Sequence, residues 1–463
     1  MKRKVALLLT LALMLTAVTG CGSASQPADQ SASQPADQSA STDKQAATEE
    51  TAGESADESA AGKIKMITWS NAGTVDALKE LNAKFQSETG IEVELTEVPS
   101  TDYESLLNTR LAANDVDIFC YTTDSRAFAQ PVVDWAPMDQ LTWESIITGG
   151  NALDLSGYDW IKNWNTGAEV CRYNDGIYGI ATGMTLMNGI FYNKKMFDDN
   201  GWTEPTTWDE FINLCEKIKA TGVAPLTVGG GDTWPCQMSA DAIVHTVEQG
   251  NEKDLSEALW TGKRTYTDET SMKVFERQME FLSYMEDGFM GIAYSDVPAR
   301  LVAGKAAMLY DGSWNAAQIE SVDPNFEYGY FALPGDDVHN FAGKYDLTFG
   351  INAKSANTEA AAKWLEFFSQ PENYTIYINS NGFVPTMSGI ESTNRFLQIL
   401  GSRVDDVDRT YECYNRIPTN VGVYGSYDPT HFAIAGGEFD NIKDRAEAAQ
   451  KDWDEAVKAA KGN

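Results

Sequence analysis

The sequence predicts an α/β fold made of two domains. Residues 63–121 alternate between strand and helix patterns, residues 177–228 repeat that alternation, and residues 326–368 place two strands before a helix. Alternation of this kind favours parallel strands with helices on the faces of the sheet. About 400 residues follow residue 62, which is enough for two ordinary domains.

The first strand is predicted at residues 63–69 and is followed by a polar turn at residues 70–73. A helix comes next, because apolar residues recur at helical spacing up to the stop signal Thr89-Gly90. Residues 91–96 alternate between apolar and polar side chains, which is typical of a half-exposed strand.

The second helix is predicted to begin at the capping-box pattern of residues 101–104, and residues 116–121 are predicted as a buried strand. Strands in this order pair in parallel through right-handed crossovers. Ligands of such sheets bind outside the carboxyl ends of the strands. We therefore expect binding residues near Asn71, after the first strand, and near Tyr121 and Asp124, after the third.

The middle of the chain carries a second set of strand and helix signals. Thr207 and Glu210 match a capping box at the start of a well-marked helix. The glycine-rich loop 229–235 carries Trp234, which has few apolar neighbours in the sequence. The predicted elements are strands at 177–182, 190–193 and 225–228 and mostly helix at 238–303.

Residues 304–314 present an aromatic side chain on a loop. The run 306–310 is predicted as a buried strand, Asp311 and Gly312 as a turn, and Trp314 follows that turn. The patterns after this stretch predict strands at 326–333 and 345–352, a helix at 361–368 ended by Pro371, and a final helix at 442–460.

The first 62 residues are predicted to lie outside the folded domains. Residues 1–20 begin with positive charge and continue with the apolar run 5–18, shorter than the roughly 20 residues that a membrane-spanning helix needs. They resemble the signal peptide of a bacterial lipoprotein, in which Cys21 is lipidated. Residues 21–62 are expected to be a lipid anchor and a disordered acidic linker, because they contain no aromatic residue. The expected location is the extracellular face of the cell membrane.

Composition and motif content exclude several classes of function. The formal net charge is −33, which disfavours nucleic acid and suits a neutral or cationic ligand. The chain shows no metal-binding or Ser–His catalytic motif, so we expect no catalysis, no cofactor and no metal. The sequence does not decide whether a disulfide forms among Cys120, Cys171, Cys215, Cys236 and Cys413.

Four stretches, in this order, resemble the family 1 extracellular solute-binding proteins of ABC importers. They lie at residues 69–71 (Trp-Ser-Asn), 178–197, 205–211 (Pro-Thr-Thr-Trp-Asp-Glu-Phe) and 304–314. The resemblance covers residues 63–463. It implies a periplasmic-binding-protein-like fold, in which two α/β lobes joined by hinge strands hold a ligand in the cleft between them.

The resemblance also implies where the lobes begin and end. The implied ranges are 63–178 plus 313–370 for lobe one, 183–308 plus 384–463 for lobe two, and 179–182, 309–312 and 369–383 for the hinge crossings.

Members of this family mostly bind oligosaccharides, whose C–H faces stack on aromatic rings and whose hydroxyls need planar donors and acceptors. The resemblance implies a lipid-anchored, monomeric binding protein. It would capture an oligosaccharide in an aromatic-lined cleft and deliver it, by lobe closure, to the permease subunits of an ABC importer. Trp314 is expected to face Trp234 across the cleft and to matter little for stability. The implied ligand-binding residues are Asn71, Tyr121, Asp124, Trp234, Trp314 and Asp346.

Two alternatives stay open at this point. With 68 acidic residues, a pair of catalytic carboxylates cannot be excluded by counting, so one alternative is a cell-surface glycoside hydrolase. The chain lacks the eightfold strand–helix repeat of a barrel enzyme, which favours binding over catalysis. The negative charge leaves open a third interpretation, a binding protein for a cationic ligand such as a polyamine, or for a peptide.

Overall fold

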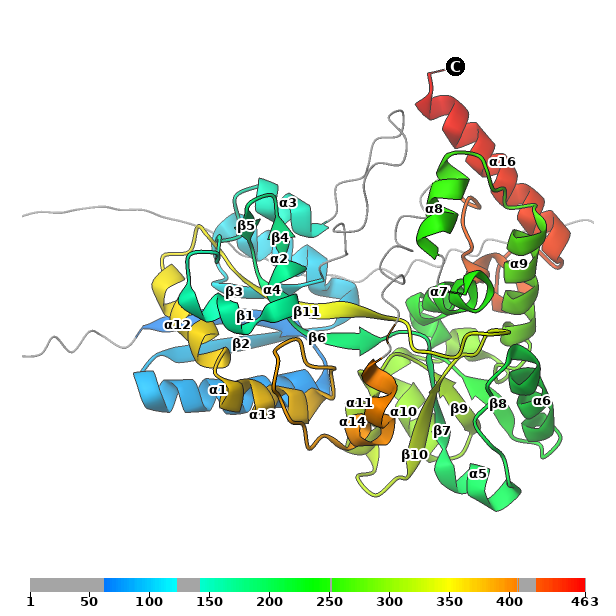
Figure 1. Ribbon diagram of the computed structural model, residues 1–463, viewed down its shortest axis with the longest axis horizontal. Helices are drawn as coiled ribbons and strands as arrows, with labels where there is room; N and C mark the ends of the chain where they lie inside the picture. Colours follow the sequence, from blue (N-terminus) through cyan, green and yellow to red (C-terminus); the bar gives the residue numbers. More distant parts are fainter. Residues whose placement is uncertain (1–61, 123–141, 250–251, 406, 408–421, 463) are drawn as a thin grey trace, which may run out of the picture. The chain divides into compact units, whose positions relative to one another are not determined.

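The computed structural model describes residues 62–122, 142–249, 252–405, 407 and 422–462, and these ranges contain two main sheets (Figure 1). One sheet has the strand order β2-β1-β3-β11-β6 and the other β10-β7-β9-β8. We call the parts built on them the first and the second lobe. The strands are β1 (Lys63–Trp69), β2 (Glu92–Val98), β3 (Ile118–Tyr121), β4 (Arg172–Tyr173), β5 (Gly176–Ile177), β6 (Ile180–Leu186), β7 (Gly189–Asn193), β8 (Ala224–Thr227), β9 (Ala306–Tyr310), β10 (Tyr328–Ala332) and β11 (Gly343–Ile351).

The helices lie between and after these strands, and most begin at a side-chain cap or a proline. They are α1 (Ala72–Thr89), α2 (Ser100–Ala113), α3 (Thr142–Thr148), α4 (Asn165–Glu169), α5 (Lys194–Asn200), α6 (Trp208–Lys219), α7 (Trp234–Glu248), α8 (Glu252–Trp260), α9 (Glu269–Leu282), α10 (Val297–Val302), α11 (Asn315–Val322), α12 (Thr358–Phe368), α13 (Pro371–Asn381), α14 (Arg395–Leu400) and α16 (Ile442–Ala460).

The first sheet confirms the predicted parallel arrangement. β1 lies between β2 and β3 and pairs with both in parallel, and β11 adds antiparallel to β3 and β6. The helix α1 begins where the Asn71 side chain accepts a hydrogen bond from the Thr74 amide, and it ends at Gly90, whose φ is 76°. Its buried face packs onto the sheet, and α13 packs beside it (Figure 1).

One predicted helix start is confirmed and another is wrong. The hydroxyl of Thr207 accepts a hydrogen bond from the Glu210 amide at 3.3 Å and caps α6 as expected. The capping box predicted at residues 101–104 does not form. Pro99 already supplies the extended backbone of a cap, so α2 begins at Ser100 and Thr101 lies inside its first turn.

The chain passes between the sheets at other places than 179–182 and 309–312. The strand β6 pairs with β11 in the first sheet, so the chain first leaves that sheet at residues 187–188. After β9 it stays in the second sheet, because β10 pairs with β7, and it returns over residues 333–342. Residues 313–332 are therefore part of the second lobe, where the implied ranges had assigned them to the first.

The third passage also differs from the predicted 369–383. Most of that range is the helix α13, which packs on α1, and Val384 then exchanges backbone hydrogen bonds with Met184 of β6. The chain reaches the second lobe at α14, which contacts β10. A buried strand or helix carries no local signal for which of two similar layers it will join, and this explains the displaced boundaries.

Asn188 connects the first two passages. Its side-chain amide donates to the Asn340 carbonyl at 3.2 Å, and its side-chain oxygen accepts from the Ala342 amide at 2.9 Å. Its backbone carbonyl accepts from Leu333 at 2.7 Å. Because Asn188 is fully buried, these bonds hold the two connecting segments firmly side by side.

Each lobe has its own hydrophobic core, and Trp314 packs against both. In the described ranges, no helix is long and apolar enough to cross a membrane. Cys120, Cys171, Cys215 and Cys236 are buried free thiols, and Cys413 lies outside the described residues. Burial raises the pKa of Cys120, Cys171 and Cys236 to about 12, so these thiols stay protonated at neutral pH.

Candidate functional site: an aromatic pocket lined by both lobes

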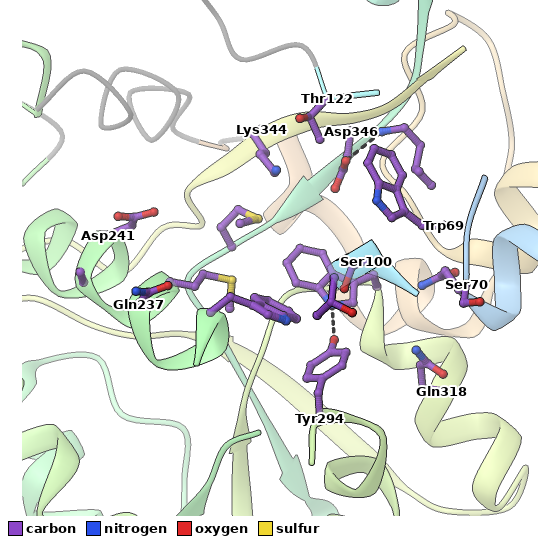
Figure 2. A pocket seen from close by; sticks show the side chains of 18 of the residues that line it. Trp69, Ser70, Ser100, Thr122, Gln237, Asp241, Tyr294, Gln318, Lys344 and Asp346 are labelled. Atoms are coloured by element: carbon purple, nitrogen blue, oxygen red, sulfur yellow. Dashed lines mark hydrogen bonds between the residues drawn. The ribbon is translucent and has the colours of Figure 1, made fainter. Parts of the chain in front are cut away.

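A pocket of about 740 Å³ is lined by residues of both lobes (Figure 2). Its volume falls in the usual range for sites that hold small molecules. Met187, in the first connecting segment, lines it as well. The first lobe contributes Trp69, Ser70, Asn71, Ser100, Thr101, Thr122, Lys344, Asp346, Leu347 and Phe383, and the second lobe contributes Trp234, Gln237, Met238, Ala240, Asp241, Tyr294, Trp314, Gln318, Ser426 and Asp428.

The first-lobe wall consists largely of residues that follow the parallel strands. Ser70 and Asn71 come after β1, Ser100 after β2 and Thr122 after β3. The carboxyl ends of parallel strands meet at one edge of a sheet, which brings these hydroxyls and the amide together. The Asn71 side-chain oxygen caps α1 at 3.1 Å from the Thr74 nitrogen, so its NH₂ group remains the donor that can serve a ligand.

Three aromatic rings form a cluster on the second-lobe wall. The ring of Tyr294 lies 4.7 Å from Trp234, and the rings of Trp234 and Trp314 lie 6.2 Å apart. The Trp314 indole N–H donates to the Tyr294 hydroxyl at 2.5 Å, a bond drawn in Figure 2. Trp234 and Trp314 are thus neighbours on one wall, and the expectation of opposite walls is wrong. Trp314 belongs to the second lobe because it lies in the chain between β9 and β10, two strands of the second sheet.

Asp346 lies on the first-lobe wall near Trp69 and Lys344 (Figure 2). Its carboxylate accepts the Leu347 amide at 2.9 Å and the Thr185 hydroxyl at 3.4 Å. Leu347 has a φ of 48°, a left-handed conformation that costs a non-glycine residue about 1 kcal/mol or more. The Thr182 hydroxyl holds the Leu347 carbonyl at 2.8 Å, so this strained backbone is fixed and Asp346 keeps its place at the pocket.

Of the six predicted ligand-binding residues, Asn71, Trp234, Trp314 and Asp346 line the pocket. Tyr121 does not. It is buried in the first lobe, where its hydroxyl donates to the Tyr178 carbonyl at 2.9 Å and its ring packs 5.7 Å from Phe119. Asp124 lies outside the described residues.

Three aromatic lining residues, Trp69, Tyr294 and Phe383, were not predicted as site residues. Trp69 ends β1, its ring 4.5 Å from Tyr103, and its place two residues before Asn71 was an available signal. Tyr294 lies in a short 3₁₀ helix, Tyr294–Asp296, where no periodic pattern points to it. Burial raises the pKa of Tyr294 well above its ordinary value, so its hydroxyl stays protonated.

Two α/β lobes with a pocket between them define a two-lobe binding protein, and the sequence match agrees with this class. The chain belongs to the bacterial extracellular solute-binding protein family, whose sequence model matches residues 71–375. Members of this family and the relatives below are binding proteins rather than enzymes. Among the described residues, no group of three His, Cys, Asp or Glu side chains could hold a metal ion.

Curated relatives carry names that refer to sugar binding. The multiple sugar-binding protein of Streptococcus mutans is 27% identical over 363 residues, which is 74% of this chain and 80% of the relative. The melibiose/raffinose/stachyose-binding protein MelE of Bacillus subtilis is 23% identical over 321 residues, 66% of this chain and 70% of the relative.

Solved structures share the fold. The solute-binding protein RafE in complex with raffinose has a TM-score of 0.65 at 22% identity, with 84% of this chain and 99% of RafE covered. A sugar transporter protein of Bacillus licheniformis in complex with stachyose has a TM-score of 0.64 at 18% identity, with 85% of this chain and 100% of that protein covered. At these identities the likeness shows the two-lobe fold.

Proposed function

We propose that this protein captures a neutral oligosaccharide and delivers it to the permease of an ABC importer. The observation that carries the proposal is the cluster of Trp234, Tyr294 and Trp314, which offers ring faces to the C–H groups of a sugar. Asn71 and Asp346, together with the hydroxyls at the strand ends, supply the donors and acceptors that sugar hydroxyls need.

The charges of the pocket support a neutral ligand over an acidic one. The carboxylates of Asp241, Asp346 and Asp428 line the pocket, and among the described lining residues Lys344 is the one basic side chain. An anionic sugar such as a uronate would meet this excess of negative charge in a partly desolvated site. The names of the relatives, which refer to raffinose, stachyose and multiple sugars, agree with a neutral ligand.

Calorimetry with a panel of sugars tests the proposal. The panel contains raffinose, stachyose, melibiose, a chitin oligosaccharide and a galacturonate oligomer of matched length. We expect heat of binding for at least one neutral sugar and at least roughly tenfold weaker binding of the acidic one. No heat and no thermal shift with any sugar, for protein shown to be folded, would overturn the proposal.

Two further assays with the same panel of sugars separate the alternative functions. A polyamine such as spermidine that binds, and that no sugar displaces, would establish a cationic ligand in this carboxylate-rich pocket. New reducing ends after incubation with the neutral sugars would establish a glycoside hydrolase. Closure of the lobes around the sugar, with Asn188 and the segments it joins as the hinge, is part of the proposal.

We also propose that Cys21 carries the lipid that holds the protein on the outer face of the membrane, with residues 22–62 as a tether. The full-length protein is expected to partition with membranes and with detergent, and Cys21→Ala is expected to be released into the soluble fraction. Cys413→Ala is the matched control and should stay with the membrane. Sedimentation of Cys21→Ala with membranes would contradict the proposal.

A further inference from the structure

Behind the aromatic cluster lies a buried carboxyl group that does not line the pocket. Asp311 follows β9 and is 1% exposed. Its Oδ1 accepts the Gly312 amide at 2.7 Å, and its Oδ2 accepts the side-chain amide of Asn315 at 2.5 Å. These two bonds close the turn that leads into α11, as expected for a turn residue. They leave unexplained why a carboxylate, rather than a neutral side chain, is buried here.

Tyr294 connects this carboxyl group to the pocket. The Tyr294 hydroxyl accepts the indole N–H of Trp314 at 2.5 Å and lies 3.4 Å from Asp311 Oδ1, to which it can donate its own proton. The result is a chain of donors that runs from the indole through the phenol to the carboxylate. The Tyr294 ring also packs at 4.7 Å on Trp234, so one residue touches both tryptophans of the cluster.

The surroundings of Asp311 are largely apolar and aromatic. The ionisable groups that face it are Tyr294, Tyr310 of β9 and Tyr330 of β10, whose hydroxyl donates to the Asp311 backbone carbonyl at 3.1 Å. Asp241 and Cys236 of α7 lie beyond Tyr310. Burial raises the pKa of Asp311 to about 7, despite the hydrogen bonds from Asn315 and Gly312 that lower it. Both forms of the acid are therefore populated near neutral pH.

We propose that Asp311 is a positioning residue for the sugar site, because its carboxylate orients the Tyr294 hydroxyl and that hydroxyl fixes the Trp314 indole in the pocket. This inference rests on the proposed function and extends it. A carboxylate is a stronger acceptor than a neutral acid, so the rings are held more firmly when Asp311 is ionised. Affinity for the sugar should thus rise with pH through neutrality, although Asp311 never touches the ligand.

Calorimetry between pH 5.5 and 8.5, with raffinose or the panel sugar that binds most tightly, tests this directly. We expect the Kd of the wild-type protein to fall about fivefold as Asp311 ionises. Asp311→Asn, which removes the charge and keeps the shape, should bind with a Kd near the wild-type value at pH 5.5 and show no pH dependence. A wild-type pH profile in Asp311→Asn would overturn the proposal.

Removal of one hydroxyl tests the connecting residue. Tyr294→Phe keeps the ring on Trp234 and is expected to lose both affinity and the pH dependence, because the indole then loses the hydroxyl that accepts its N–H at 2.5 Å. Tyr192→Phe is the matched control. Its hydroxyl bonds Glu204 at 2.9 Å, away from the pocket, and the variant should bind as the wild type does. Unchanged affinity in Tyr294→Phe would sink the inference.

A readout without ligand separates a failure of this inference from a failure of the proposed function. The ring environment of Trp314, followed by ¹⁹F NMR of fluorotryptophan-labelled protein and assigned with Trp314→Phe, should titrate near pH 7 in the wild type and not in Asp311→Asn. If no sugar binds but this titration is present, the positioning network holds and the proposed function falls. If sugar binds and the titration is absent, the inference falls alone.

Discussion

Replacing Trp314 with alanine is expected to weaken sugar binding by at least roughly thirtyfold, the effect of losing a central aromatic anchor. The Trp314 ring lies 6.2 Å from Trp234 and its indole N–H is held by the Tyr294 hydroxyl. The variant therefore loses a stacking surface for the sugar and leaves the Tyr294 hydroxyl without the indole that it binds. The measurement is the Kd by calorimetry at pH 8, where Asp311 is ionised and the wild-type cluster is held most firmly.

The structure changes what this variant should do to stability. Trp314 packs against the cores of both lobes, so alanine should also reduce the free energy of unfolding by about 1–3 kcal/mol. The sequence alone had led to the expectation that stability would hardly change, because a tryptophan after an Asp-Gly turn gives no indication of what it packs against.

Trp202→Ala is the matched control for both effects. Trp202 is also a half-buried tryptophan of the second lobe, with its ring 5.7 Å from Phe197, but it does not line the pocket. It should lose a comparable amount of stability and keep its affinity for sugar. Equal affinities in Trp314→Ala and Trp202→Ala would show that the cluster is core and that the ligand binds elsewhere.

Local patterns in the sequence were sufficient to predict the strands and the strand order of most of the first lobe. The strand β1 has the predicted bounds, and the parallel order of β1, β2 and β3 follows from the two helical crossovers between them. The same logic located Asn71 at the pocket, because the end of a parallel strand is fixed by where its apolar run stops.

Local patterns could not predict which of the two sheets a strand joins. Every residue of β6 and of β10 is buried, so neither strand shows an alternation that would reveal which sheet it joins. The pairing of β6 with β11 and of β10 with β7 joins segments more than 130 residues apart, and no local signal reports such contacts. The first two of the three misplaced crossings have this cause.

The residues of the candidate site also fall into two groups, those that local patterns could predict and those that depend on packing between distant segments. Trp234, Trp314 and Asp346 line the pocket as predicted, Trp314 from the stretch 304–314 that carries the resemblance and Trp234 from its glycine-rich loop. Tyr121 has the right residue type at the right strand end, but its side chain packs inside the lobe on Phe119. Tyr294 reaches the pocket only because its segment packs against Gly229 and Trp234, a contact that no spacing in the sequence encodes.

Replacing Arg445 with methionine is expected to reduce both stability and affinity, although Arg445 does not line the pocket. Arg445 is fully buried on α16, where its guanidinium donates to the carbonyls of Tyr424, Ser426 and Asp428 and lies 5.0 Å from the Phe275 ring. Methionine fills much of the volume but donates nothing. Loss of two to three bonds from a charged donor should cost about 3–5 kcal/mol in the free energy of unfolding, measured by urea denaturation.

Affinity should fall as well, because two of the three carbonyls that Arg445 binds belong to residues of the pocket. Ser426 and Asp428 line the pocket, and Asp428 accepts the Gln237 side-chain amide at 2.8 Å, so Arg445 holds one edge of the second-lobe wall in place. Affinity should fall by roughly tenfold under conditions where the variant is still folded. Lys443→Met on the same helix is the control, because its side chain is 76% exposed and pairs only with Glu447 among the ion pairs seen on the described part of α16. It should change neither the stability nor the affinity measurably.

Two outcomes would contradict this role of Arg445. A stable Arg445→Met protein with weakened binding would mean that the segment is held by other contacts and that Arg445 acts on the pocket electrostatically. An unstable protein with unchanged affinity would remove residues 426–428 from the binding surface.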